Sequence, residues 1–216
     1  LGDRMGMRMA QVHRDNGVDL RLDVTVQAIE GGERVERVRL ADGTVIPADV
    51  VVVAVGVRPA TDWLQESGLT LDDGVVCDER LIAGPGIVAA GDLVRWPNQR
   101  FGTMMRIEHW ENAVEQGRAA ALSLLHGEAA EPFAPVPWFW SDQYDTKIQL
   151  AGWPGADARV EVVEEDESTG RLVALYGRDG KVVGVLGLNR PRQVMQYRMQ
   201  IEAGLGWDEA IAAARS

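Results

Sequence analysis

Apolar residues recur along the N-terminal quarter of the chain first with helical and then with strand spacing. In residues 4–14 they stand four and three positions apart, at Met5, Met9 and Val12, which predicts a helix. Over residues 18–26 every second residue is apolar, the pattern of a strand with one buried face. Turn sequences at residues 30–33 and at Asp42-Gly43 separate two further short strands, so we expect a β-meander.

Longer apolar segments follow the meander. Val50–Gly56 is a continuous apolar run, typical of a strand covered on both faces in a parallel sheet. Ile87–Asp92 predicts a second short core strand, which stops at a glycine. Residues 108–126 predict a long helix with an apolar stripe formed by Ala113, Val114, Gly117, Ala121, Leu124 and Leu125. Core strands combined with a long helix indicate an α/β architecture in this part of the chain.

The pattern changes near residue 137. Residues 128–137 are rich in proline, alanine and glutamate, which predicts a linker between domains. Beyond it, apolar runs predict three strands, at residues 160–163, 172–176 and 182–186, and then two helices, at residues 191–203 and 207–215. An antiparallel sheet followed by helices indicates a C-terminal α+β domain.

Composition narrows the function classes. The chain has 22 Lys and Arg against 33 Asp and Glu, a net charge of −11, and so lacks the basic surface that nucleic-acid phosphates require. No run of about 18 apolar residues occurs, so we expect no membrane span and a cytoplasmic protein. Cys77 is the only cysteine and is expected to be a small buried hydrophobe. The three histidines are widely separated, and no metal site is predicted.

Three local patterns carry candidate binding chemistry, and each has a plain structural alternative. Gly56 ends the predicted parallel strand, where backbone can approach a dinucleotide; a turn closed by Pro59 explains it as well. Asp92 follows a core strand and is placed to accept hydrogen bonds from sugar hydroxyls, or else to cap a turn. Trp110 stands where the long helix begins, and there it either stacks on an electron-rich ring or fills a domain seam.

In this order and spacing the patterns resemble the pyridine-nucleotide-dependent flavoprotein reductases. More narrowly, they resemble the oxygenase-coupled ferredoxin reductases, which include the reductases of biphenyl dioxygenase, putidaredoxin and rubredoxin. Val50–Pro59 is similar to the end of an NADH-binding domain, and Ile87–Asp92 to the second FAD motif. RIEHWENAVEQG, residues 106–117, is similar to the helix under the flavin, and PWFWSDQY, residues 137–144, to the opening of the C-terminal domain.

The resemblance covers essentially the whole chain and implies its domain organisation. Residues 1–57 and 58–127 would be the C-terminal parts of the NADH-binding and FAD-binding domains, that is, remnants of two dinucleotide-binding domains. Residues 128–137 would be the linker. Residues 138–216 would form the C-terminal reductase domain, which takes part in dimerisation and faces the ferredoxin.

The resemblance also implies roles for single residues. Gly91 and Asp92 would contact the ribityl or pyrophosphate region of FAD, and Trp110 would lie against the isoalloxazine and nicotinamide rings. Glu108 and His109 would lie near the same rings. Trp140 would stand on the ferredoxin-facing side of the flavin, and Gly56 would approach NADH. The implied chemistry is hydride transfer from NADH to the flavin and then two single-electron transfers to an iron–sulfur ferredoxin, with no side chain needed as acid or base.

The family carries two Gly-x-Gly-x-x-Gly loops, one for each nucleotide, and this sequence contains neither. The chain also begins at Leu1 rather than methionine. We therefore expect the C-terminal part of a longer reductase, in which FAD and NADH are the cofactors of the parent protein. A non-enzymatic dimerisation or docking module remains the alternative. So does another flavoprotein oxidoreductase, although a disulfide reductase needs a C-terminal His-Glu pair and no histidine follows His126.

Ferredoxins of this class are usually acidic, as is the present chain, so docking would require a local basic patch. The candidate side chains are six arginines, three near the predicted flavin motifs and three around the first C-terminal helix: Arg95, Arg100, Arg106, Arg190, Arg192 and Arg198. The alternative is that these are scattered, solvated arginines on a charged surface.

Overall fold

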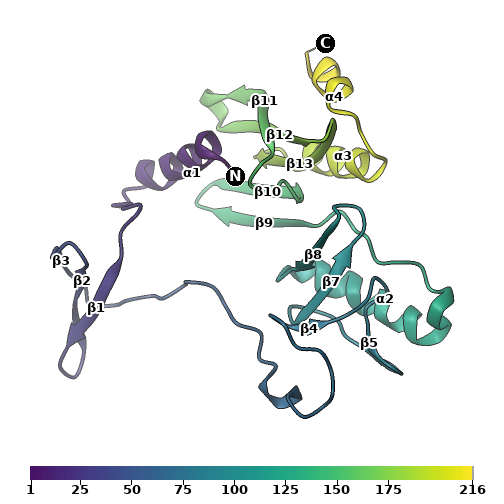
Figure 1. The fold of residues 1–216 in the computed structure, drawn as a ribbon. Helices are drawn as coiled ribbons and strands as arrows, with labels where there is room; N and C mark the ends of the chain where they lie inside the picture. Colours follow the sequence, from purple (N-terminus) through teal and green to yellow (C-terminus); the bar gives the residue numbers. More distant parts are fainter. Residues whose placement is uncertain (216) are drawn as a thin grey trace. The chain divides into compact units, whose positions relative to one another are not determined.

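The computed structural model describes residues 1–215, so Ser216, the last residue of the predicted C-terminal domain, lies outside the described part (Figure 1). The chain forms two compact units, Leu1–Val57 and Arg58–Ser216. The first unit contains helix α1 (Asp3–Asp15) and an antiparallel sheet in the order β1 (Val26–Gly31), β2 (Val35–Leu40) and β3 (Val45–Pro47). The predicted helix and hairpin are therefore present.

Two strand predictions in this unit are wrong. The first strand begins only at Val26, and residues 18–25 have no strand structure. Val50–Gly56 forms no strand either, and its side chains are open to solvent, with Val52 85% and Val55 90% exposed. A strand forms where neighbouring backbone takes up its N–H and C=O groups, and no described residue pairs with this run. An apolar run alone is therefore not enough to form the parallel sheet.

The first half of the second unit surrounds one hydrophobic core. A mixed sheet in the order β4-β7-β8 pairs β4 with β7 in parallel and β7 with β8 antiparallel, and β5 and β6 form a separate pair. Trp96 on β7 is fully buried at the centre, together with Val94 and Met105. The elements are η1 (Asp62–Leu64), β4 (Val75–Val76), β5 (Ile82–Gly84), β6 (Ile87–Val88), β7 (Val94–Asn98), β8 (Thr103–Arg106), α2 (Trp110–His126) and η2 (Gly127–Ala129).

Helix α2 ends at Gly127 as predicted, but the predicted apolar stripe lies on the wrong face. The buried side chains are Asn112, Gln116, Ala120 and Ser123. Val114, Leu124 and Leu125 of the predicted stripe are 53%, 55% and 76% exposed. The core of this unit therefore meets the polar face of the helix. Three of its four buried side chains carry hydrogen-bonding groups, which need specific partners.

The segment predicted as a linker is held tightly against the β7–β8 hairpin. Trp96 Nε1 donates to the carbonyl of Phe133 (3.0 Å), and Asn98 Nδ2 donates to that of Pro135 (3.1 Å). Arg100 joins three parts of the unit. Its Nε donates to the carbonyl of Ala134 (3.1 Å). Its Nη1 donates to the carbonyl of Glu202, the last residue of helix α3 (Pro191–Glu202), at 2.7 Å.

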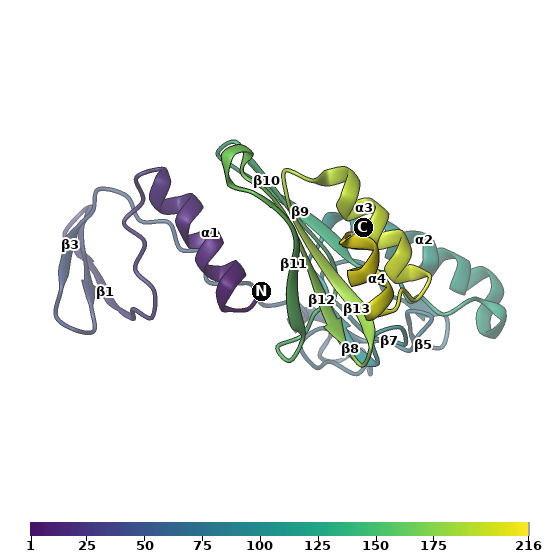
Figure 2. The same ribbon diagram turned by 90° about the horizontal axis from the view of Figure 1, so that it is seen from above.

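The C-terminal part is a five-stranded antiparallel sheet in the order β11-β12-β13-β10-β9 with helices on one face (Figure 2). Its three predicted strands and two predicted helices are present. Two strands were missed, because apolar positions in residues 138–152 do not alternate clearly. The elements are β9 (Trp138–Gln143), β10 (Thr146–Gly152), β11 (Arg159–Asp166), η3 (Glu167–Thr169), β12 (Arg171–Arg178), β13 (Lys181–Leu188), α3 (Pro191–Glu202) and α4 (Trp207–Ala214).

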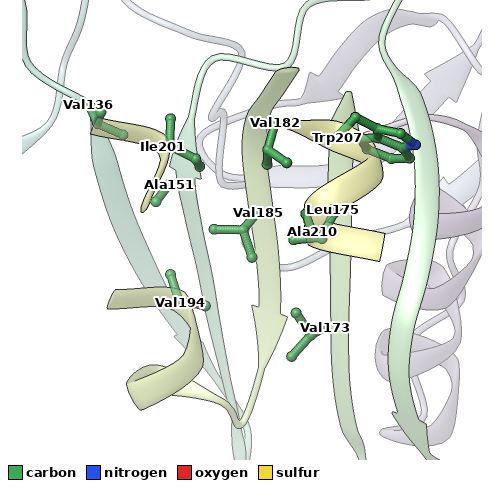
Figure 3. Close-up of a cluster of buried hydrophobic side chains, with 10 residues drawn as sticks. All are labelled: Val136, Ala151, Val173, Leu175, Val182, Val185, Val194, Ile201, Trp207 and Ala210. Carbon is green, nitrogen blue, oxygen red and sulfur yellow. The ribbon is translucent and has the colours of Figure 1, made fainter. Parts of the chain in front are cut away.

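Two glycines let the helices approach this sheet. A Cβ on Gly187 would lie 2.3 Å from Val194 Cγ2 of α3, and one on Gly177 would lie 2.1 Å from the ring of Trp207. Figure 3 shows Val194, Ile201 and Trp207 facing the apolar side chains of β10, β12 and β13. Arg159 closes this core at its edge, with its guanidinium carbon 4.0 Å from the centre of the Trp207 ring.

Candidate functional site

The site is built on the N-terminal end of α2. Trp110 is the first helical residue, and His109 precedes it with an extended backbone and no side-chain cap. The first N–H groups of a helix have no partner within the helix, and the dipole makes this end positive. The Trp110 side chain is 70% exposed here. An exposed aromatic face beside free N–H groups suits an electron-rich ring.

Strand β9 supplies the opposite wall. A cavity of about 210 Å³ is lined by the start of α2 and by the aromatic residues of β9: Glu108, His109, Trp110, Glu111, Trp138, Phe139 and Trp140. The centres of the His109 and Phe139 rings are 4.8 Å apart, and those of Trp138 and Trp140 are 5.1 Å apart. The cavity is smaller than the roughly 300–1,000 Å³ of a complete ligand pocket, so by itself it could enclose only part of a cofactor. Four of the seven predicted site residues, Glu108, His109, Trp110 and Trp140, meet here.

His109 is mostly buried at this wall. Burial lowers the pKa of its imidazole, and the nearby carboxylates of Asp92 and Glu108 only partly oppose that effect. Its Nδ1 is buried and makes no hydrogen bond to any described residue. Glu108 is itself paired with Arg106, which also contacts Asp73 at 3.1 Å. The lowered pKa favours the neutral imidazole at neutral pH, and the buried Nδ1 has no partner among the described residues.

Gly91 and Asp92 form a turn held against α2. Gly91 has φ +91°, in the region that favours glycine, and its N–H donates to Gln116 Oε1 at 2.8 Å. Arg106 Nη1 donates to the carbonyl of Asp92 at 3.2 Å. Sequence reasoning missed Gln116, although one signal was available. Asn112 and Gln116 are polar residues one helical turn apart on the buried face.

Three polar atoms on α2 and at its start are buried without a hydrogen-bond partner among the described residues. They are His109 Nδ1, Asn112 Oδ1 and Gln116 Nε2. Buried polar atoms usually have partners, so an unpaired group marks a place where a ligand or water binds. Of the three residues, only His109 lines the cavity, next to the helix end and the Trp110 face, which suit a flat aromatic ring such as a flavin. The sequence offers no Gly-x-Gly-x-x-Gly loop for the adenosine end.

Gly56 lies in the other compact unit, and its approach to NADH stays a prediction. Its φ is +100°, and a Cβ built on it would meet no atom within 4 Å. In the part of the chain that the structure describes, no helix is long and apolar enough to cross a membrane.

The predicted basic patch is mostly neutralised. Arg190 pairs with Glu164, Arg198 with Glu115, Arg95 with Asp72, Arg106 with Asp73 and Glu108, and Arg100 donates to two carbonyls. Among the six predicted arginines, only Arg192 has no ion pair or hydrogen bond to another described residue, and it is exposed. Local carboxylates therefore balance four of the six arginines, and the position of a ferredoxin-docking face stays a prediction.

Comparison with known proteins agrees with this architecture. Residues 138–216 match the family described as Reductase C-terminal. The 5,5'-dehydrodivanillate O-demethylase ferredoxin reductase subunit of Sphingobium sp. is 40% identical over 89% of this chain and 47% of its own length. Putidaredoxin reductase of Pseudomonas putida is 32% identical over 93% of this chain and 49% of its own length. The chain spans about half the length of the curated relatives it matches.

The fold of this chain is also similar to that of solved structures. The crystal structure of Fdr9 superposes with a TM-score of 0.85 at 39% identity, covering 97% of this chain and 53% of that one. The covalent putidaredoxin reductase–putidaredoxin complex gives a TM-score of 0.85 at 30% identity over 93% and 48%. Residues 1–117, more than half of the chain, match the pyridine nucleotide-disulphide oxidoreductase family. The chain therefore belongs to that family, and the predicted fold class is confirmed.

Proposed function

We propose that the chain is part of a flavoprotein reductase that passes electrons from NADH through FAD to an iron–sulfur ferredoxin serving an oxygenase. The observation that carries the proposal is the cavity where the positive end of α2 meets the aromatic strand β9. Relatives named as ferredoxin reductases support it, and one solved relative is a covalent complex with its redox partner.

In this proposal the described residues bind and orient the flavin. Gly91 and Asp92 contact the ribityl or pyrophosphate region, and Trp110 covers the ring and excludes water from it. Glu108 and His109 border the ring, and Trp140 (42% exposed) lies toward the ferredoxin. FAD, when bound, accepts a hydride and releases single electrons. The unpaired N–H groups of α2 stabilise negative charge that develops nearby. The neutral His109 serves as a hydrogen-bonding group rather than as an acid or base.

We also propose the finer organisation of the molecule. Two hydrophobic clusters, one around Trp96 and one between the five-stranded sheet and α3 and α4, support the boundary at the 128–137 segment. An acidic ferredoxin would bind through the C-terminal domain despite the net charge of −11. Dimerisation through this domain and a cytoplasmic location belong to the same proposal. Light scattering on the purified protein tests the first, and cell fractionation tests the second.

The direct test is the flavin itself. The purified chain is mixed with FAD, freed of unbound cofactor and scanned for the yellow absorbance band and for quenching of flavin fluorescence. Retained flavin that NADH or dithionite bleaches supports the proposal. In a protein that also carries the glycine loops, Asp92→Ala should weaken flavin retention about ten- to a hundredfold, because a charged acceptor is lost. Unchanged flavin content after dialysis contradicts the role of Asp92.

A second function has its own observation. Val50–Gly56 and the outer face of α2 both expose apolar side chains. Exposed apolar side chains of this kind are typical of protein contacts. A colourless protein that stays folded and self-associates, or that binds a ferredoxin without reducing it, favours the non-enzymatic dimerisation or docking module.

A further inference from the structure

The turn at Gly91 and Asp92 is fixed at almost every backbone group. The Gly91 carbonyl accepts from Val94 N–H (3.0 Å), and the Leu93 carbonyl accepts from Val75 N–H (2.7 Å). Gly91 N–H and the Asp92 carbonyl are instead held by side chains, those of Gln116 and Arg106. Two residues distant in sequence thus anchor the same short turn.

The Asp92 carboxylate contrasts with its anchored backbone. The residue is exposed, and its carboxylate makes no hydrogen bond or ion pair with any residue that the structure describes. An acceptor whose backbone is already fixed loses little conformational freedom when a ligand binds, so affinity is gained through preorganisation.

Gln116 is an unusual side chain for its position. It is fully buried, and its Nε2 has no partner among the described residues, while its Oε1 accepts from Gly91 N–H at 2.8 Å. A buried donor without a partner is costly, and an apolar side chain of similar size would avoid that cost. The contact with Gly91 is therefore what this amide contributes to the fold.

Arg106 extends the anchoring to the cavity wall. Its guanidinium contacts the Asp92 carbonyl, the carboxylate of Asp73 and the carboxylate of Glu108 next to His109. The turn and the start of α2 are thereby linked through one planar side chain, which can hold several acceptors in fixed directions.

We infer that Gln116 is a positioning residue that, together with Arg106, locks the Gly91–Asp92 turn so that the Asp92 carboxylate is presented to a polyhydroxylated ligand. The ligand identity, the ribityl or sugar hydroxyls of FAD, rests on the proposed function. The lock itself does not, since it is present in the protein alone.

Hydrogen exchange tests the lock without any cofactor. In the ¹⁵N-labelled chain the Gly91 amide should be protected, although the neighbouring Asp92 is exposed. Gln116→Leu should accelerate Gly91 exchange at least about tenfold beyond the change in amides elsewhere in the unit, because only that N–H loses its acceptor. Ser123→Ala is the matched control. Ser123 is on the same helix and donates from its buried hydroxyl to the Arg80 carbonyl at 2.6 Å, so it should leave Gly91 protection unchanged.

Gln116→Glu tests the chemistry of the contact, since a carboxyl group keeps an acceptor oxygen in place, and Gly91 protection should return. If Gln116→Leu does not fold, the wild-type measurement still decides, because an unprotected Gly91 amide overturns the lock. Equal Gly91 exchange in wild type and Gln116→Leu overturns it as well.

Flavin titration of the same variants tests the ligand separately. Affinity for FAD should fall about ten- to a hundredfold in Gln116→Leu and remain unchanged in Ser123→Ala. Faster Gly91 exchange with unchanged FAD affinity shows that the turn does not serve the flavin. Failure of the wild-type chain to bind FAD overturns the proposed function for this chain and the ligand assigned to the turn, while the exchange result on the lock still stands.

Discussion

The imidazole of His109 lies against the ring of Phe139, with the ring centres 4.8 Å apart and the planes inclined by 44°. This contact joins the residue that precedes α2 to the start of strand β9. Opposite walls of the candidate flavin site therefore support each other through one aromatic pair.

Replacing Phe139 by a smaller side chain should raise the pKa of His109. Burial lowers this pKa, so Phe139→Leu admits water and moves it back toward the ordinary value of about 6.5. An NMR titration of the His109 ring protons measures the shift, with His109→Gln for assignment. Phe133→Leu, which alters the stacking on Trp96 instead, is the control and should leave the His109 pKa unchanged.

The lowered pKa of His109 also has a consequence for stability. As pH falls below about 6.5, the unfolded chain takes up the His109 proton before the folded protein does, so the free energy of unfolding decreases. Urea unfolding at pH 7.5 and pH 5 should show a smaller loss in His109→Gln than in wild type. An identical loss in both proteins contradicts the assignment.

Trp110→Ala should show whether the Trp110 side chain contributes to the stability of the fold or to flavin reduction. Because the side chain is 70% exposed, its removal should change the free energy of unfolding by no more than about 0.5 kcal/mol. In a flavin-loaded protein that also carries the glycine loops, the variant should slow flavin reduction by NADH, as followed by stopped-flow bleaching. A large drop in melting temperature with an unchanged reduction rate would show that the tryptophan only supports the fold.

Cys77 should make the fold sensitive to alkali. Burial raises the pKa of its thiol from an ordinary 9.0 to about 11. Between these values the unfolded chain releases the proton first, so stability falls as pH rises above 9 and levels off above 11, by at most about 2–3 kcal/mol. The unfolding curves at pH 8 and pH 10.5 should lie closer together in Cys77→Ala than in wild type. The same pH dependence in both proteins would rule out the thiol as its source.

Charge reversal at Arg190 should affect stability, whereas charge reversal at Arg192 should affect ferredoxin reduction. Arg190→Glu places like charge against Glu164 and should lower the melting temperature. Arg192→Glu changes an exposed cation and should leave melting unchanged. In a protein that also carries the glycine loops, the same change should slow ferredoxin reduction and make it less dependent on salt. NADH-driven reduction of a small artificial acceptor is the control. If Arg192→Glu slows both reactions equally, the docking face lies elsewhere.

Two glycine substitutions should change the free energy of unfolding in opposite directions. Gly177→Ala forces a methyl group into the ring of Trp207 and should cost about 1–3 kcal/mol or more. Gly117→Ala on α2 meets no atom within 4 Å and should stabilise the helix by about 0.5–1 kcal/mol. Urea midpoints at constant slope compare the two. A stable Gly177→Ala would mean that α4 can move away from β12.

Sequence pattern predicted the elements that fold through their own contacts. Strands β12 and β13 are joined by Asp179 and Gly180, both at positive φ, and pair over their whole length, so local turn chemistry and apolar runs were sufficient. Val50–Gly56 has equally strong strand character but lies exposed. A strand in a parallel sheet depends on distant neighbours, which periodicity does not reveal.

The candidate site was predictable to a similar degree. Glu108, His109, Trp110 and Trp140 were expected near one another from the family resemblance, and they line one cavity. Gln116, which sequence reasoning missed, acts through a contact with a residue that is distant in sequence. Gln116 reaches Gly91, 25 positions earlier, and the helix face that carries it is polar, so a search for apolar stripes selected the opposite face.

Arg100 links two parts of residues 58–215 that could otherwise unfold locally on their own. Its guanidinium binds a carbonyl of the 128–137 segment and another at the end of α3. Opening of the β7–β8 hairpin away from the C-terminal helices breaks the bond to Glu202, and Phe101, next to Arg100, packs against both hydrophobic clusters. The two hydrophobic clusters should therefore behave as one cooperative foldon, with a shared opening free energy at the slowest-exchanging amides of β7 and β13.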